Sequence, residues 1–282
     1  MHWFRSTTTA AALAALLVSV PAAAQPNKQY EPSVGQPGKD VIWVPTPDDV
    51  VERMLRMAQV TANDYVIDLG AGDGKIAIMA AKKFGARAMG IEYDPDMARH
   101  AQRNVVKAGV AGKARIMQGD IFVSDFTQAT VITMYLLPAL NLKLRPQLLN
   151  MRPGTRVVSH SFNLDDWEPD EISSMDGRRA YFWVVPASVG GAWTLELSGG
   201  GVAERLELTL EQRYQRIEGT VALRAGLGGL REPRLRGFQI AFAWVDDQGL
   251  RREFSGRVSG ARMEGGFRAD NGSEGRWTAT RK

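Results

Sequence analysis

Three carboxylates stand at the ends of three predicted β-strands, where they could together bind a polar ligand. Asp68 lies near the end of the apolar run YVIDL, Glu92 lies near the end of the run RAMGIEY, and Asp120 follows the strand predicted over 114–118. The carboxyl ends of parallel strands meet at one edge of a sheet, and ligands bind in the crevice outside that edge. We therefore expect the three side chains to line a single crevice.

The glycine turn that follows Asp68 separates two classes of ligand. Residues 70–74 have the spacing G-x-G-x-G, whereas a dinucleotide-binding turn has G-x-G-x-x-G beneath a pyrophosphate. Glycines in such a turn let backbone amides approach a ligand closely. Asp68 would repel a pyrophosphate at this position, but its carboxylate can accept charge-assisted hydrogen bonds from an ammonium group. The pattern therefore favours an amino-acid group as the ligand of the turn.

The other two acids suit the remaining parts of a nucleoside ligand. The two carboxylate oxygens of Glu92 can accept hydrogen bonds from both hydroxyls of a ribose. Asp120 can accept a hydrogen bond from an adenine amino group while Ile121 packs on the ring. A single acid at a strand end often only caps a helix, but three acids at three successive strand ends favour an adenosine-containing ligand.

The segments around these acids predict a doubly wound α/β fold with a mostly parallel, seven-stranded, Rossmann-like sheet. Thr46 as N-cap and Pro47 begin a predicted helix over 47–58, and strands then alternate with helical segments as far as the strand predicted over 155–161. Such alternation predicts a parallel sheet covered on both faces. The turn Met175-Asp176-Gly177 predicts that the sheet ends in an antiparallel hairpin.

The motifs resemble those of class I S-adenosylmethionine-dependent methyltransferases over about residues 41–186. VIDLGAGDGKIAI resembles the first motif of that family, GIEYDP the second and GDIF the third. The resemblance implies that S-adenosylmethionine is the cofactor. It also implies that Asp68, Gly70 and Gly72 hold the methionine portion, Glu92 the ribose, and Asp120 with Ile121 the adenine.

A narrower similarity concerns the methyl acceptor. The segments VPTP, VVERML, ITMYLLP and PGTRVVSHSF, with Trp167, resemble the family of the ATP synthase c-subunit lysine methyltransferases and their bacterial relatives. This resemblance implies a protein substrate with a lysine side chain as acceptor. An apolar channel would lower the pKa of a lysine by disfavouring its charged form. The residues predicted to line the substrate pocket are Pro45, Tyr135, Phe162 and Trp167.

The catalytic group remains unassigned. Methyl transfer depends mainly on alignment and exclusion of water, so no dedicated base is obligatory. His160 fits either a general base or a hydrogen-bonded core histidine. The sequence MYLLP stands where methyltransferases acting on nucleic-acid bases often carry N/D-P-P-Y/F, so nucleic acid is not expected as a partner. The chain has no cysteine and no His and carboxylate cluster with metal-ligand spacing, so we expect no metal.

The first 24 residues predict a signal peptide. Arg5 precedes an apolar run that is too short to span a bilayer, and the small residues Ala22–Ala24 form a cleavage signal. We expect cleavage after Ala24 to leave an exported, periplasmic protein without an integral membrane span. Residues 25–40 are rich in Pro, Gly and polar residues, so they predict a flexible lead-in without regular structure.

The pattern changes to period two near residue 190, which predicts a separate antiparallel all-β domain of about seven strands, either a curled sheet or a small barrel. Residues 191–282 contain 14 Arg and one Lys against 12 acidic residues, whereas residues 25–190 are balanced at 19 of each sign.

The predicted organisation is a signal peptide at 1–24, the lead-in at 25–40, a methyltransferase domain at 41–189 and the all-β domain at 190–282. Two alternatives stay open: a small-molecule methyltransferase, and an exported non-catalytic binding protein that retains the fold. The sequence does not indicate the oligomeric state.

Overall fold

The computed structural model describes residues 1–2 and 30–282. The predicted signal peptide and the first part of the predicted lead-in fall mainly on residues 3–29, so they lie outside the described residues. Among the residues that the structure does describe, no helix is both long and apolar enough to cross a membrane.

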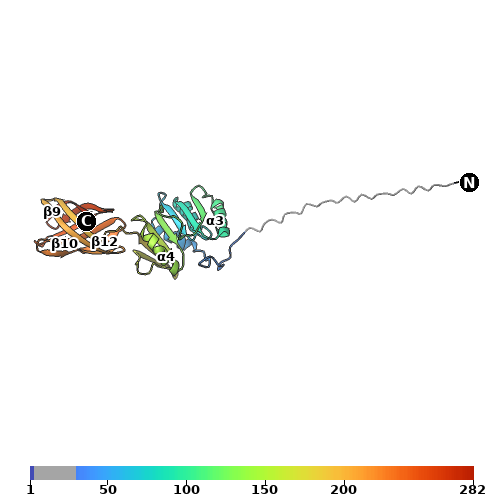
Figure 1. Ribbon diagram of the computed structural model, residues 1–282, viewed down its shortest axis with the longest axis horizontal. Coiled ribbons are helices and arrows are strands. Elements are labelled where there is room, and N and C mark those ends of the chain that lie inside the picture. Colours follow the sequence, from blue (N-terminus) through green and yellow to red (C-terminus); the bar gives the residue numbers. More distant parts are fainter. Residues whose placement is uncertain (3–29) are drawn as a thin grey trace. The chain divides into compact units, whose positions relative to one another are not determined.

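The first part of the chain forms a seven-stranded sheet, as predicted (Figure 1). Five strands are parallel, and β7 pairs antiparallel with both β5 and β6. In spatial order the strands are β3 (Ala114–Gln118), β2 (Arg87–Glu92), β1 (Tyr65–Leu69), β4 (Val131–Met134), β5 (Arg156–His160), β7 (Arg178–Val184) and β6 (Glu171–Met175).

Helices cover both faces of this sheet. The helices are α1 (Asp48–Met57), α2 (Lys75–Phe84), α3 (Pro95–Lys107) and α4 (Pro138–Leu149). Side chains from α1, α2 and α3 share a core with one set of alternating strand residues, which includes Val66 and Val131. Leu144 and Leu148 of α4 share a second core with the other set, which includes Ile67 and Ile132. The alternation confirms the predicted doubly wound sheet.

The starts of α3 and α1 differ in how they are capped. Asp94 caps α3, because its Oδ1 accepts a hydrogen bond from the Met97 amide at 2.7 Å, with Pro95 at the first helical position. The predicted capping role of Thr46 is wrong. Pro47, with extended ψ, occupies the N-cap position of α1, so Thr46 lies one residue outside the helix and its hydroxyl is 3.2 Å from Nδ1 of His160 instead.

The second sheet is entirely antiparallel and has nine strands rather than about seven. In spatial order they are β11 (Gly226–Gly229), β10 (Arg216–Leu223), β9 (Val202–Arg213), β8 (Gly191–Gly199), β16 (Glu274–Arg281), β15 (Arg262–Ala269), β14 (Arg251–Ser259), β13 (Gln239–Val245) and β12 (Arg231–Arg236). The short strands β11 and β12 lack a clear hydrophobic alternation, which explains why the pattern underestimates the number.

This nine-stranded sheet curls until β10 contacts β12, which nearly closes it around an aromatic core. The core contains the buried side chains of Trp193, Trp244 and Trp277. Gly256 and Gly265 pair across β14 and β15, and a Cβ at Gly256 would lie 2.6 Å from the Trp277 ring. Glycine is therefore required where this tryptophan packs directly on the sheet.

Candidate functional site

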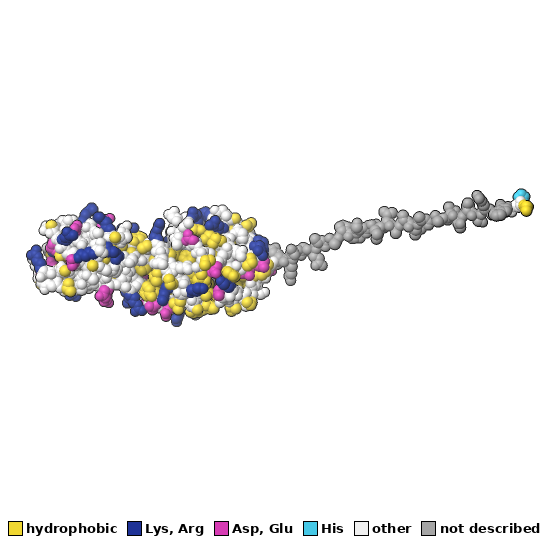
Figure 2. All heavy atoms as spheres, viewed as in Figure 1, with side chains coloured by type: hydrophobic (Ala, Val, Ile, Leu, Met, Phe, Trp, Pro, Cys, Tyr) yellow, Lys and Arg dark blue, Asp and Glu magenta, His cyan; other side chains and the backbone are white. Residues whose placement is uncertain are grey.

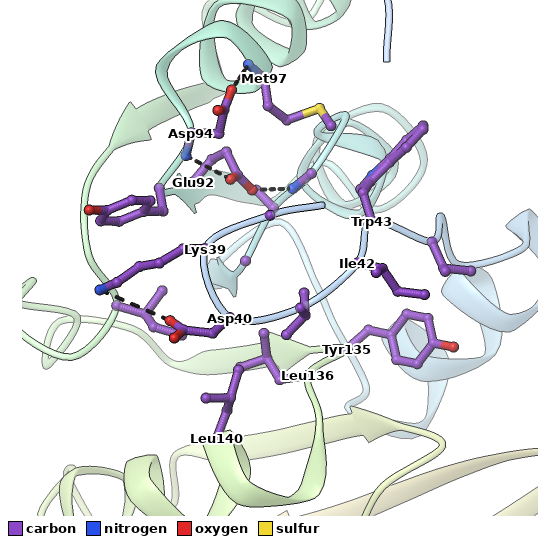
Figure 3. Close-up of a pocket in the computed structure, with 18 of the residues that line it drawn as sticks. Lys39, Asp40, Ile42, Trp43, Glu92, Asp94, Met97, Tyr135, Leu136 and Leu140 are labelled. Atoms are coloured by element: carbon purple, nitrogen blue, oxygen red, sulfur yellow. Dashed lines mark hydrogen bonds and ion pairs between the residues drawn. The ribbon is translucent and has the colours of Figure 1, made fainter. Parts of the chain in front are cut away.

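A cavity of about 270 Å³ lies at the carboxyl ends of the central strands of the first sheet (Figure 3). Strands β1, β2 and β4 point their ends toward it, as expected for a ligand site in an open α/β sheet. All six residues predicted to bind the cofactor line this cavity: Asp68, Gly70, Gly72, Glu92, Asp120 and Ile121. The structure therefore brings together the three acids that the sequence placed at separate strand ends, while their binding roles remain predictions.

The glycine turn after β1 needs glycine at its centre. Gly70, Gly72 and Gly74 have φ angles of 79°, 53° and 82°, in the left-handed region that side chains disfavour. A Cβ at Gly72 would lie only 2.6 Å from Nε1 of Trp43, so the turn also leaves room for an indole that comes from outside the sheet.

Glu92 holds this turn in place from the end of β2. Its Oε2 accepts a hydrogen bond from the Gly72 amide at 2.8 Å, and its Oε1 accepts one from the Asp94 amide at 3.0 Å (Figure 3). Burial raises the pKa of this carboxyl, and the two amide bonds act in the opposite direction. Each oxygen keeps a lone pair, so Glu92 can brace the turn and bind a ligand that lies in the cavity.

Asp68 is almost fully buried at the end of β1. Its side chain is 2% exposed, and its Oδ1 accepts a hydrogen bond from the Thr133 hydroxyl at 2.8 Å. Burial raises its pKa to about 8, against the opposing effect of the Thr133 bond. A bound ammonium group would favour the charged form, which makes this carboxyl a suitable site for the amino group of an amino-acid ligand.

Asp120 is already engaged by a lysine that no sequence motif identifies. Lys39 donates a hydrogen bond to Oδ2 of Asp120 at 2.8 Å, and its ammonium lies 4.4 Å from the centre of the Tyr93 ring. The lysine is the main cause that lowers the pKa of Asp120, with further help from the Phe122 amide. The adenine end of the predicted site is therefore paired with a cation from the N-terminal segment.

Lys39 belongs to a segment that crosses the mouth of the cavity, which we name the strap (residues 35–45) (Figure 3). The composition of residues 25–40 predicts no regular structure, whereas the strap forms a hydrogen-bonded turn. The Gly35 amide donates to the Trp43 carbonyl at 2.8 Å, and the Trp43 amide donates to the Gln36 carbonyl at 2.9 Å. Composition does not show this pairing, nor the bond that Lys39 of the strap makes far along the chain with Asp120.

The predicted acceptor residues divide into two groups. Pro45, Tyr135 and Phe162 line the cavity, and the rings of Tyr135 and Phe162 are stacked with centroids 6.3 Å apart. Trp167 does not line it. The chain turns away from the cavity after Phe162, and Trp167 is fully buried, with its ring 6.0 Å from the rings of Trp183 and Tyr214.

His160 lies behind Tyr135, with ring centroids 4.0 Å apart, and is not among the residues that line the cavity. Its side chain is buried, and burial followed by the charge of Arg178 lowers its pKa to about 4. Near neutral pH the ring is therefore uncharged and packed between Thr46 and Tyr135. This position favours the interpretation of His160 as a hydrogen-bonded core histidine that supports Tyr135.

Within residues 1–2 and 30–282, no group of three or more His, Asp or Glu residues is arranged to hold a metal ion. Besides the three predicted acids, the residues that line the cavity include the carboxylates of Asp40, Asp73 and Asp94 and the ammonium groups of Lys39 and Lys75.

Comparisons with known proteins agree with this geometry. Residues 68–171 match the model of the ANTKMT methyltransferase domain family. A protein-lysine N-methyltransferase from Saccharolobus islandicus is 46% identical over 151 residues, which cover 51% of this chain and 94% of the relative. The mouse ATP synthase c-subunit lysine N-methyltransferase is 31% identical over 132 residues, which cover 46% of this chain but only 53% of the mouse protein.

A solved structure with the same fold is described as acting on RNA rather than on lysine. An RNA methyltransferase from Salinibacter ruber, in complex with S-adenosyl-L-homocysteine, is 48% identical with a TM-score of 0.51. The match covers 52% of this chain and 96% of that chain. Since the Saccharolobus and Salinibacter relatives are matched along nearly their whole length, the chain belongs to their family, the S-adenosylmethionine-dependent methyltransferases, and S-adenosylmethionine is its cofactor.

Proposed function

We propose that this enzyme transfers a methyl group to the side-chain amine of a lysine in a protein substrate. The observation that carries the proposal is the similarity to the Saccharolobus islandicus protein-lysine N-methyltransferase, which extends over 94% of that relative. The match covers about half of this chain, so it bears on the methyl-transfer site and leaves the role of the second sheet open.

The acceptor side of the cavity has the chemistry that a lysine needs. Its wall includes Pro45, Tyr135, Leu136 and Phe162, which are apolar or aromatic. A lysine has an unperturbed pKa of about 10.4 and reacts only after it loses its proton. An apolar wall disfavours the ammonium form and so lowers that pKa. The same wall excludes water and restricts the direction from which the amine approaches.

The residues of the cavity also fit the cofactor. S-adenosylmethionine supplies a methyl group that is bound to a positively charged sulfur. Asp68 offers a buried carboxylate for the amino group of the methionine portion, and Glu92 offers two oxygens for the ribose. Gly70 and Gly72 line the cavity in a left-handed turn, where glycines allow a ligand to lie close to the backbone. Tyr135 and Phe162 would then lie on the side of the cavity that receives the acceptor nitrogen.

Methylation of RNA is the second candidate, because the Salinibacter ruber relative is described as an RNA methyltransferase. Two observations argue against it for this chain. The sequence MYLLP replaces the motif typical of enzymes that act on nucleic-acid bases, and residues 25–190 carry equal numbers of basic and acidic side chains. On the face shown in Figure 2, Lys and Arg side chains are scattered rather than gathered into one basic stripe.

Labelled methyl transfer tests the proposal. Purified enzyme and S-adenosylmethionine with a labelled methyl group are incubated with a cell-envelope extract, which is then separated into protein, RNA and small molecules. We expect label in protein, and on lysine after digestion and mass spectrometry. Label only in RNA or only in small molecules would overturn the lysine proposal and favour the corresponding alternative.

A pair of matched variants shows whether the label depends on the predicted site. Asp68→Asn should abolish transfer, because it removes the carboxylate that faces the amino group of the cofactor. Asp125→Asn is the control, since Asp125 is an aspartate near the same sheet that bonds to Thr127 and does not line the cavity. Calorimetry with S-adenosyl-L-homocysteine adds an independent result. An absence of binding by the folded wild-type protein would instead support a non-catalytic binding protein.

We also propose that the enzyme acts outside the cytoplasm, after cleavage of the predicted signal peptide behind Ala24. Since S-adenosylmethionine is made in the cytoplasm, this location requires a supply of cofactor from the producing cell. Fractionation of expressing cells, followed by N-terminal sequencing, tests the proposal. A mature chain that begins at Gln25 in the periplasmic fraction is expected, and an uncleaved cytoplasmic chain would contradict it.

A further inference from the structure

The loop that follows β5 carries part of the acceptor wall in a conformation that needs support. We name residues 161–168 the acceptor loop, because its Phe162 lines the cavity. Ser161 and Asp165 have φ angles of 63° and 59°, in the left-handed region that residues other than glycine seldom adopt. Contacts from elsewhere must therefore hold the loop in this shape.

One set of supporting contacts comes from α4, a helix that packs on the first sheet. Nδ2 of Asn141, a fully buried side chain, donates hydrogen bonds to the carbonyls of Phe162 and Asn163 at 3.2 and 3.1 Å. Arg145 donates to the carbonyl of Leu164 at 2.9 Å. These bonds fix the first half of the acceptor loop beside the cavity.

The second half of the loop is held from two directions. Arg145 of α4 also pairs with Asp166, and Nε1 of Trp183 on β7 donates to the Trp167 carbonyl at 2.8 Å, while the nine-stranded sheet adds a further set of contacts. The tight turn of this sheet between β9 and β10, residues 213–216, contacts three side chains of the loop: Asp166, Trp167 and Glu168. The hydroxyl of Tyr214 lies 3.1 Å from both carboxylate oxygens of Asp166, and Arg213 pairs with Asp166 at 3.0 Å. Nε1 of Trp167 donates to Oε1 of Gln215 at 3.0 Å.

Further contacts make this attachment specific. The rings of Tyr214 and Trp167 are stacked with centroids 6.0 Å apart. Nε2 of Gln215 donates to the carbonyl of Glu168 at 2.7 Å, and Arg216 forms an ion pair with the Glu168 side chain. Each of the four residues of the turn thus bonds to one or more of the last three residues of the loop.

The turn is itself anchored to the connection between the two sheets. Nε2 of Gln212 donates to the carbonyls of Ala187 and Tyr214 at 2.8 and 2.7 Å, and its Oε1 accepts a hydrogen bond from the Val189 amide at 2.7 Å. This single side chain therefore joins the β9–β10 turn to the segment that leads out of the first sheet.

We infer that the β9–β10 turn positions the acceptor wall, so that the nine-stranded sheet contributes to methyl transfer through the acceptor loop. The inference rests on the proposed function for its kinetic consequence. Tyr214 and Gln215 act as positioning residues, because they hold the loop and do not line the cavity. The cofactor end of the cavity, at Asp68 and Glu92, is built at the ends of β1 and β2 and should not depend on this turn.

The test uses the full chain with a double substitution, Tyr214→Ala with Gln215→Ala. Arg205→Ala is the matched control, because Arg205 lies on the same strand β9 and pairs with the exposed Glu196, at 3.9 Å, rather than with the loop. Three quantities are measured for each variant. They are the hydrogen exchange of peptides that cover 161–168, the Kd of S-adenosyl-L-homocysteine, and the rate of methyl transfer to the protein that gains label in the extract experiment.

For the double variant we expect at least tenfold faster exchange in the acceptor loop, a Kd within twofold of wild type, and a KM for the acceptor protein raised about fivefold or more. Tyr214→Phe keeps the ring on Trp167 and should give an intermediate result. The control should match wild type throughout.

Three results would overturn the inference. Unchanged exchange in the loop would show that the turn does not hold it, whether or not the wild-type enzyme methylates any protein. Faster exchange with unaltered KM and kcat would show that the attachment is only structural. A parallel loss of S-adenosyl-L-homocysteine binding would show a general effect on the fold. Failure of the wild-type enzyme to label protein would instead count against the proposed function alone.

Discussion

Replacement of Glu92 by glutamine tests the predicted role of the acid at the end of β2. The variant keeps the size of the side chain but removes its charge and turns one acceptor oxygen into a donor. The backbone amide of either Gly72 or Asp94 then faces the side-chain NH₂ group, so two donors oppose each other. One hydroxyl of the ribose also loses the oxygen predicted to accept its hydrogen bond. A hydrogen bond to a charged group contributes about 1.5–3 kcal/mol. Since about 1.4 kcal/mol corresponds to a factor of ten, affinity should fall about 10- to 100-fold.

Calorimetric titration with S-adenosyl-L-homocysteine measures this loss without knowledge of the methyl acceptor. Glu52→Gln is the matched control, because Glu52 lies on α1, pairs with Arg56 and Lys83, and does not line the cavity. Far-ultraviolet circular dichroism should show the same secondary structure in both variants. If the folded Glu92→Gln protein binds with a Kd within twofold of wild type, the assignment of Glu92 to the cofactor is wrong.

Three further predictions concern charge. The pKa of Asp68 is about 8 in the folded protein against an ordinary value of 3.8, so between these pH values the native state binds a proton that the unfolded state has lost. The free energy of unfolding of the cofactor-free protein should therefore fall as pH rises between about 4 and 8. Asp68→Asn should abolish this trend in urea denaturation. The pKa of His160 is shifted in the opposite direction, to about 4 from an ordinary value of 6.5, so here the unfolded state binds the extra proton. The free energy of unfolding should fall as pH drops from about 6.5 to 4, and His160→Gln should flatten that trend in the same assay. Lys39→Ala should tighten S-adenosyl-L-homocysteine binding by less than about fivefold, because it frees Asp120 from an exposed ion pair, while Lys39→Arg should behave as wild type. Weaker binding by Lys39→Ala would show that Lys39 mainly anchors the strap.

The sequence predicts the first sheet, and the edge of it at which the three acids meet, because both follow from local patterns. A strand end, a glycine turn and a helix start lie within a few residues of one another around Asp68, and the parallel topology then brings Glu92 and Asp120 to the same edge. The acceptor side is less well predicted. Phe162 and Trp167 are aromatic residues of one loop, yet only Phe162 reaches the cavity, because the loop reverses direction at left-handed residues that no local pattern marks.

Two contacts that the sequence does not predict share one physical cause, which is that polar side chains bond to segments far away in the chain. Lys39 reaches Asp120 across 81 residues, and Tyr214 reaches Asp166 across 48. Neither pair has a periodicity or a motif, because a single hydrogen bond constrains only two positions. Both pairs bear on the cavity, one through the strap and the other through the acceptor loop. If the prediction for Lys39 and the inference for the β9–β10 turn both hold, substitutions in the strap change the affinity for the cofactor and substitutions in the turn change the positioning of the acceptor, so their effects on methyl transfer should be additive.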